Sequence, residues 1–121
     1  MTDDDAREAV RLYFEATQSG STQQWLSRFA PGAVVEDPVG TEPLRDREAL
    51  ERQGDAFLGG FREVGLHPGF VSVAGHRAAA SWEGRALTHD GETVSFEGID
   101  TFEFDEDGLI TKMMGYWTPP G

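Results

Sequence analysis

The half of the chain that follows Leu66 alternates between long runs of β-forming residues and short turn segments. The runs are Phe70 to Val73, Ala78 to Leu87, Thr93 to Phe104 and Leu109 to Trp117. The segments between them are Ala74-Gly75-His76, His89-Asp90-Gly91 and Asp105-Glu106-Asp107-Gly108. Because Asp-Gly turns between alternating runs are strong hairpin signals, this half of the chain predicts an antiparallel meander.

The first sixty or so residues carry helical patterns instead. Apolar positions from Thr2 to Gly20 recur at helical spacing, with aspartates at the start and a glycine at the end. A second, shorter helix is predicted from a cap at Ser21 or Thr22, carrying Trp25, Leu26 and Phe29 and ending before Pro31-Gly32. A strand from Ala33 to Asp37 follows it.

A third helix is predicted after a loop from Val39 to Arg45. Asp46 can cap it, its apolar positions reach Phe57, and Gly59-Gly60 closes it. Helices followed by an antiparallel sheet predict an α+β domain in which the helices cover one face of the sheet. A chain of 121 residues is expected to form one such domain, residues 1–121.

The composition excludes several classes of partner. The formal net charge is −12, so the chain offers no basic patch for nucleic acid or for an anionic membrane surface. The chain has no cysteine, which excludes disulfides, thiolate metal sites and a cysteine nucleophile. The acidic N-terminus lacks a signal-peptide layout and no apolar run is long enough to span a membrane, so a cytoplasmic protein is expected.

Asp37 lies within the segment VVEDPVG, where it ends the predicted strand just before Pro38 and shares a face with the apolar Val35. Burying a carboxylate without a partner is costly, so its presence there needs an explanation. Pro38 favours extended geometry in the residue before it and so helps to hold Asp37. Asp37 therefore either caps the loop or serves as a functional carboxylate.

Asp100 lies within VSFEGIDTFEF, where alternation places it on the same face as Val94, Phe96, Phe102 and Phe104. Desolvation there raises the pKa of a carboxyl group, and a neutral acid at pH 7 can donate a hydrogen bond. The alternative is that Asp100 accepts hydrogen bonds from a buried backbone or side-chain group.

Tyr13 lies on the core-facing side of the first helix, where a buried phenol needs a hydrogen-bond partner. It is either a core tyrosine or a functional donor. Together, Tyr13, Asp37 and Asp100 form a set of two neutral donors and one carboxylate base. Such a set suits abstraction of a proton next to a carbonyl, because the donors stabilise the enolate. No metal is expected, because His67, His76 and His89 lack ligand spacing.

The chain resembles the bacterial ketosteroid isomerases, in the nuclear-transport-factor-2-like, or SnoaL-like, superfamily. The segments that carry the resemblance are RLYFEA, VVEDPVG, GIDTFEFDEDG and MMGYW, in family order over nearly the whole chain. The resemblance implies a cone-shaped α+β fold with three N-terminal helices packed on a curved, mostly antiparallel sheet. It also implies a steroid delta-isomerase that moves a C=C bond from the 5,6 to the 4,5 position of a 3-ketosteroid without a cofactor.

The resemblance also assigns roles to residues. Asp37 matches the general base that transfers a proton from C4 to C6, and Tyr13 and protonated Asp100 match the donors to the dienolate oxygen. Trp117 matches a tryptophan that lines the site and helps position the base. Pocket-lining positions are expected from parity and composition at Phe57, Phe96, Phe102 and Met113.

The chain departs from the family pattern at two positions, and the resemblance also implies an oligomeric state. Gly54 and Phe29 stand where well-known members carry tyrosines that hydrogen-bond toward the oxyanion tyrosine, so Tyr13 is expected to lack that network. Family members imply a homodimer across the outer face of the sheet, to which Trp82 and Leu87 are expected to contribute.

Two other functions are compatible with this sequence. Because fold does not fix function, the superfamily also includes polyketide cyclases, dehydratases and epoxide hydrolases. A non-catalytic binder of apolar small molecules would keep the pocket and need no base. Under that reading, Asp37→Asn leaves ligand affinity intact.

Overall fold

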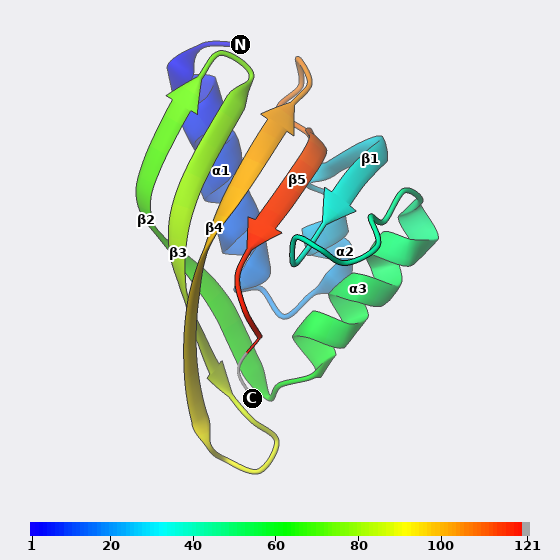
Figure 1. Cartoon of the computed structure of the whole chain (residues 1–121), viewed down its shortest axis with the longest axis vertical. Coiled ribbons are helices and arrows are strands. Elements are labelled where there is room, and N and C mark those ends of the chain that lie inside the picture. The colour runs from blue at the N-terminus through cyan, green and yellow to red at the C-terminus, as the bar shows by residue number, and fades with distance from the viewer. Residues whose placement is uncertain (120–121) are drawn as a thin grey trace.

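Five strands form one sheet in the computed structural model, which describes residues 1–119. The strand order is β1-β5-β4-β3-β2, and Figure 1 shows the sheet with its three helices. The helices are α1 (Asp3–Thr17), α2 (Thr22–Leu26) and α3 (Arg47–Gly59). The strands are β1 (Phe29–Glu36), β2 (Glu63–Ala74), β3 (Arg77–Leu87), β4 (Thr93–Phe104) and β5 (Ile110–Tyr116).

The predicted meander is confirmed. Strands β2, β3, β4 and β5 pair in sequence order and all antiparallel. Each tight turn has a glycine with positive φ, namely Gly75 at 60°, Gly91 at 87° and Gly108 at 79°, a conformation that other residues rarely adopt. Among the paired strands of residues 1–119, only β1 and β5 run parallel to each other. The sheet is therefore mostly antiparallel, as expected.

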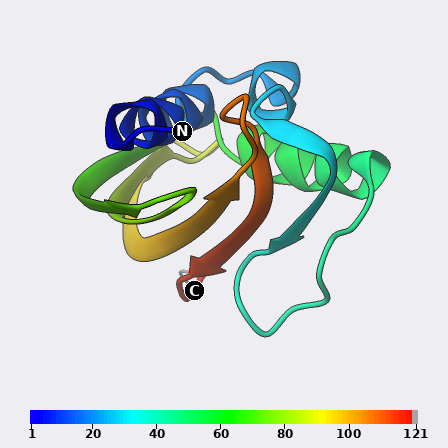
Figure 2. The same cartoon turned by 90° about the horizontal axis from the view of Figure 1, so that it is seen from above.

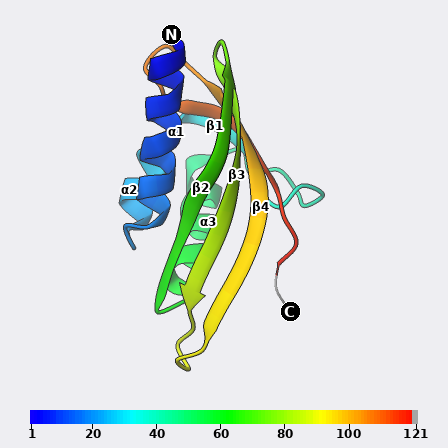
Figure 3. The same ribbon diagram turned by 90° about the vertical axis from the view of Figure 1, so that its left-hand side faces the viewer.

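All three helices lie on one side of the curved sheet (Figures 2 and 3). Helix α1 packs against β2 and β3, while α3 packs against α2 and β1. The start of α1 is fixed by a capping box, in which the Thr2 hydroxyl accepts from the Asp5 backbone N–H at 3.1 Å and Asp5 accepts from the Thr2 backbone N–H at 3.0 Å. Asp46 caps α3, as predicted. The α+β fold with helices on one face is confirmed.

Phe29 begins β1 and does not belong to the second helix, so that part of the prediction is wrong. Helix α2 ends at Leu26, and Phe29 pairs with Ile110 of β5. Pro31 and Gly32 lie inside β1, where the pairing shifts register between Phe29 and Val34. Pro31 is tolerated because β1 is an edge strand, in which an unpaired backbone position costs little.

Strand β2 begins at Glu63, earlier than the alternating pattern indicated, because its first half pairs with the end of β3 from Glu63↔Leu87 onward. Strand β4 alternates as predicted, with Asp100 and Phe102 buried on the helix side and Ile99 exposed on the outer face. This alternation brings Asp100 into the space between the sheet and the helices. Among residues 1–119, no helix is long and apolar enough to cross a membrane.

Candidate active site

A small cavity lies between the helices and the inner face of the sheet. All three helices and all five strands, or the chain directly after them, contribute to its walls. Its lining residues are Tyr13, Trp25, Asp37, Gln53, Phe57, Leu66, Trp82, Phe96, Asp100 and Trp117. The cavity holds about 30 Å³ for water-sized molecules. Three titratable groups, Tyr13, Asp37 and Asp100, thus share an otherwise mostly apolar space.

Asp37 directly follows β1 and is the least buried of the three groups. Its Oδ1 accepts a hydrogen bond from the indole N–H of Trp117 at 2.5 Å, and its backbone carbonyl accepts from the Gln53 amide at 3.3 Å. Burial raises the pKa of Asp37, and the Trp117 hydrogen bond opposes that rise. A partly exposed carboxylate with a raised pKa is well suited to accept a proton.

Asp100 is almost fully buried in β4, with 1% of its surface exposed. Burial raises its pKa well above the ordinary value, and the nearby charge of Asp37 raises it further. The two carboxyl groups approach each other over Gly115 of β5. A Cβ added to Gly115 would collide with Oδ1 of Asp37 and would come within 3.2 Å of Oδ1 of Asp100. Burial and the neighbouring carboxylate therefore both favour the neutral form of Asp100, which can donate a hydrogen bond.

Tyr13 comes from α1 and is 2% exposed. Burial raises the pKa of its phenol well above 10, and the charges of Asp100 and Asp37 act in the same direction. Its ring is held edge-on by Phe14 at 5.2 Å, Phe29 at 6.1 Å and Phe102 at 5.1 Å between ring centroids. The Tyr13 hydroxyl therefore stays protonated and available as a donor.

Each titratable group of the cavity faces one tryptophan. Trp117 hydrogen-bonds to Asp37. The indole of Trp25 lowers the pKa of Tyr13 by interacting with its hydroxyl, and the indole of Trp82 acts in the same way on Asp100. The Trp82 N–H is nevertheless without a hydrogen-bond partner in the described part of the chain, so this second contact falls short of a bond. All three tryptophans of the chain thus line one cavity.

Trp25 occupies the space beside Gly54, where the resemblance places a tyrosine. A Cβ on Gly54 would come within 3.0 Å of the Trp25 ring and within 3.0 Å of the Thr22 methyl group. Trp25 also packs on Phe29, with ring centroids 4.7 Å apart. The two departures from the family therefore form one structural unit, because Trp25 of α2 packs against both Gly54 and Phe29.

Six of the eight side chains expected at the site from the sequence line this cavity: Tyr13, Asp37, Phe57, Phe96, Asp100 and Trp117. The other two, Phe102 and Met113, are buried in the core instead. Phe102 packs against Tyr13 and so supports the site from behind its wall. Met113 of β5 is opposite Phe102 of β4 in the sheet pairing.

Sequence reasoning missed four lining residues, Trp25, Gln53, Leu66 and Trp82. The placement of Trp82 on the outer, dimer-forming face is wrong, because Trp82 is 4% exposed and lines the cavity. Its position could have been found from parity, since buried residues alternate along β3 as Ala78, Ala80 and Trp82. Trp25 and Gln53 enter through the packing of α2 and α3 on the sheet, which no local pattern encodes.

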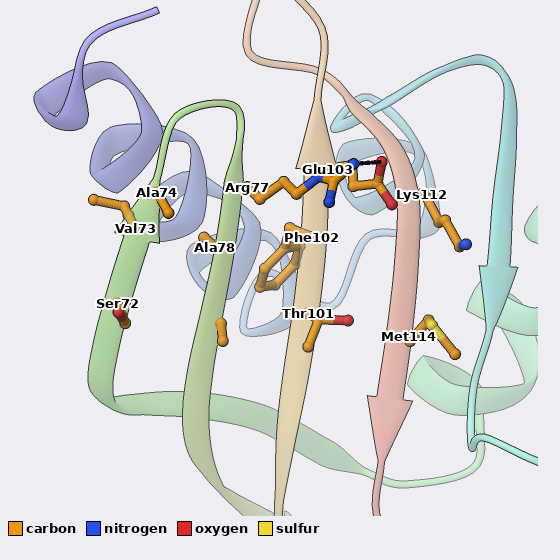
Figure 4. Close-up of a pocket in the computed structure, with 11 residues that line it drawn as sticks. Ser72, Val73, Ala74, Arg77, Ala78, Thr101, Phe102, Glu103, Lys112 and Met114 are labelled. Carbon is orange, nitrogen blue, oxygen red and sulfur yellow. Dashed lines mark ion pairs between the residues drawn. The ribbon is translucent and has the colours of Figure 1, made fainter.

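A larger hollow of about 380 Å³ lies on the opposite face of the sheet (Figure 4). Thr101 and Glu103, which alternate with the inward Asp100 and Phe102, line it, and Arg77 and Glu103 form an ion pair there at 3.6 Å. This hollow is open and lacks buried titratable groups. The chemistry of the chain is therefore concentrated in the smaller inner cavity.

The histidines lie outside the cavity. His76 is 3.4 Å from Glu106 in a turn, and a ring nitrogen of His89 is 2.9 Å from the Gly59 carbonyl oxygen. Within residues 1–119 there is no group of three or more His, Asp or Glu side chains arranged to hold a metal ion.

Comparison with known proteins shows the family. The model of the SnoaL-like domain matches residues 10–113. The chain is 35% identical over 116 residues to a steroid Delta-isomerase of Nocardioides simplex, covering 95% of this chain and 91% of that protein. This similarity supports an isomerase.

Two solved structures are also similar. One is SalBIII, an epoxide hydrolase/cyclase-like enzyme, with a TM-score of 0.87, 25% identity, and coverage of 98% of this chain and 95% of that one. The other is a Δ5-3-ketosteroid isomerase from Mycobacterium sp., with a TM-score of 0.80, 26% identity, and coverage of 94% and 93%. By sequence and by structure, the chain belongs to the SnoaL-like domain family.

Proposed function

We propose that this protein is a steroid delta-isomerase that moves the C=C bond of a 3-ketosteroid from the 5,6 to the 4,5 position. The observation that carries the proposal is the grouping of one partly exposed carboxylate and two buried, neutral donors in one apolar cavity. The similarity to the Nocardioides steroid Delta-isomerase supports the same reaction.

Asp37 acts as the general base in this proposal. It takes a proton from C4 of the steroid, and the electrons of that C–H bond form the dienolate. The protonated carboxyl then returns its proton to C6, and the double bond moves into conjugation with the ketone. One carboxylate serves both transfers when C4 and C6 lie on the same side of the ring system. The Trp117 N–H and the Gln53 amide hold Asp37 in place.

Tyr13 and Asp100 donate hydrogen bonds to the dienolate oxygen. Both groups remain protonated at neutral pH because burial disfavours their charged forms. Donors that are already oriented and desolvated stabilise charge that develops in the transition state. No cofactor takes part in this reaction scheme.

The magnitudes are sufficient for an enzyme. A positioned general base contributes roughly 10²–10⁴-fold to the rate, and each oxyanion donor contributes about 2.7–4 kcal/mol. One base and two donors together lower the activation free energy by about 8 to 13 kcal/mol, which lies within the range that enzymes achieve.

A steroid needs more room than the cavity offers in this structure. Three of the lining aromatic side chains, Phe57, Phe96 and Trp117, are only partly buried. Phe61 stacks on Phe96 with ring centroids 6.5 Å apart, next to this group. In the proposed function, binding requires Phe57 and Phe96 to rotate outward, which partly exposed side chains do readily, while Trp117 keeps its hydrogen bond to Asp37.

The test follows the ultraviolet absorbance of the protein mixed with a β,γ-unsaturated 3-ketosteroid. Growth of the conjugated enone signal is expected, and Asp37→Asn should reduce its rate by roughly 10²-fold or more, because the base is lost. The matched control is Asp46→Asn, which changes a carboxylate at the N-cap of α3, outside the cavity. A signal that Asp37→Asn leaves unchanged would contradict the proposal.

Absence of turnover, with tight binding of a phenolic steroid retained, would instead favour a non-catalytic binder of apolar molecules. In that case Asp37→Asn would leave the affinity unchanged.

An epoxide hydrolase or cyclase is the second candidate, favoured by the similarity to SalBIII. Asp37 would then activate a hydroxyl nucleophile while Asp100 protonates the oxygen of the opening epoxide. The experiment is to offer a hydroxy-epoxide and analyse products by mass and by retention on chromatography. Cyclised or hydrolysed product without any enone formation from the steroid would replace the first proposal with this one.

We also propose that the protein is a homodimer in the cytoplasm. Ile99 and Tyr116 are cross-strand partners on the outer face of the sheet, and they are 49% and 47% exposed. Burying such side chains would favour association. Sedimentation velocity should give twice the mass of the chain, and Ile99→Lys should shift it to the mass of one chain. A single-chain mass for the unaltered protein would exclude the dimer.

A further inference from the structure

Two buried polar atoms in the cavity region lack hydrogen-bond partners in the described part of the chain. They are Nε1 of Trp82 and Oδ2 of Asp100. Leaving a buried donor or acceptor unpaired is unfavourable, so such groups in a folded protein call for an explanation. Nε1 of Trp82 is a donor. Oδ2 of Asp100 is an acceptor when the proton of the acid lies on Oδ1.

The sheet register brings the two side chains together. Trp82 of β3 is opposite Gly98 of β4, and Asp100 of β4 is opposite Ala80 of β3. The two residues are therefore diagonal neighbours on the inner face, within reach of a long aromatic side chain. A Cβ on Gly98 would meet Cζ2 of Trp82 at 2.5 Å, so the nitrogen-bearing edge of the indole extends toward β4.

The two oxygens of Asp100 face different neighbours. Oδ1 lies near Gly115, at the place where the Asp37 carboxylate also approaches that residue. Oδ2 is fully buried and has no hydrogen-bond partner among residues 1–119. Because one oxygen faces the carboxylate side of the cavity, the other is left for the indole N–H.

We propose that Trp82 is a positioning residue whose indole N–H donates to Oδ2 of Asp100 when a ligand fills the cavity, so that the acid's proton lies on Oδ1 and points toward the ligand's oxygen. A neutral carboxyl group has one proton, and an N–H donor pairs best with the oxygen that lacks it. The role of Trp82 rests on the proposed function in one respect, namely that Asp100 acts as a donor to the ligand.

The charged and titratable groups that act on Asp100 come from several elements. Tyr13 of α1 and Asp37 after β1 share the cavity with it, and the charge of Asp37 raises its pKa. The Trp82 indole opposes that rise. Removing the indole N–H therefore removes a group that stabilises the carboxylate form, and the pKa of Asp100 should rise further.

The test compares Trp82→Phe with the unaltered protein by two readouts. The first is the affinity for a phenolic steroid such as equilenin, which should weaken about tenfold, equivalent to about 1.4 kcal/mol. In an Asp100→Leu background, Trp82→Phe should have no further effect, because the group it positions is gone. The matched control, Phe96→Leu, alters a ring 5.7 Å from Trp82 and should weaken binding equally in both backgrounds.

The second readout is the pH titration of the Asp100 carboxyl carbon by ¹³C NMR, measured with the phenolic steroid bound and identified by its absence from Asp100→Asn. Trp82→Phe should move this titration to higher pH. If Trp82→Phe does not fold, Trp82→Met serves instead, because it also removes the indole N–H and its flexible side chain fills irregular core space. An unchanged titration, or an equal loss of affinity in the Asp100→Leu background, would overturn the positioning role.

Neither readout requires turnover. A protein that forms no enone but shows the Trp82-dependent titration would refute the isomerase and keep the inference. A protein that forms enone but shows no Trp82-dependent titration would keep the isomerase and refute the positioning role of Trp82.

Discussion

At the scale of single residues, the site pairs each acid with an indole rather than with a charged group. Trp117 bonds to Asp37, while Trp25 and Trp82 face Tyr13 and Asp100. An indole N–H is a neutral donor that cannot titrate, so it modifies an acid without adding a charge to an apolar cavity. The raised pKa values of the three groups are therefore set mainly by burial and by one another.

The Trp117–Asp37 hydrogen bond yields a prediction about pH. Trp117→Phe removes a donor that lowers the pKa of Asp37, so that pKa should rise above its value in the unaltered protein. The base works only when deprotonated, so the acidic limb of the pH–rate profile should move to higher pH. On that acidic limb the rate should fall by up to roughly tenfold at a given pH, as expected for the loss of one hydrogen bond. An acidic limb in the same place would show that Trp117 does not influence the base.

At the scale of secondary-structure elements, the position of α2 depends on a glycine in α3. Gly54 is buried, and its missing side chain makes room for Trp25 and Thr22 of α2. The contact between these helices brings Trp25 to the cavity beside Tyr13. Glycine, which is unfavourable within a helix, thus occupies the position in α3 at which α2 approaches closely.

Substitution of Gly54 tests this contact. Gly54→Ala should lower the free energy of unfolding by about 1–3 kcal/mol through overpacking, because its methyl group meets two side chains at 3.0 Å. The matched control is Gly59→Ala near the end of the same helix, where nothing lies within 4 Å. That change should raise stability by about 0.5–1 kcal/mol through helix propensity. Urea unfolding measures both, and equal effects of the two substitutions would contradict the packing argument.

At the scale of the whole molecule, burial of Asp100 couples global stability to pH. The unfolded chain ionises Asp100 near its ordinary pKa of 3.8, whereas the folded chain keeps it protonated to higher pH. Between those two values the folded state binds more protons, so stability falls as pH rises. Burial of the Asp100 carboxyl group thus lowers the stability of the folded protein at the pH values at which the protonated acid can act as a donor.

Asp100→Asn isolates that effect. The variant should gain stability relative to the unaltered protein as pH rises above about 4, by about 1.4 kcal/mol per pH unit until the folded-state pKa is reached. Below about pH 4 the difference in stability between Asp100→Asn and the unaltered protein should not change with pH. Urea unfolding at several pH values from 3 to 8 measures it. Parallel stability curves would mean that Asp100 ionises alike in the folded and unfolded states.

The sequence by itself determined the antiparallel meander, the three helices and the inward direction of Asp100. Each follows from a local rule, such as the Asp-Gly turns, the cap at Asp46 and the strict alternation of β4. Parity likewise placed Asp37 beside Val35, and helical spacing placed Tyr13 toward the core. These features depend on neighbours within a few residues, so a linear pattern contains them.

Only the tertiary structure decided how the site is completed. Phe29 became a strand residue because Ile110, far along the chain, was available to pair with it. Trp25 reached Tyr13 because Gly54 of another helix left space for its ring. Contacts of this kind join residues that are distant in the sequence, and packing, rather than local preference, selects them.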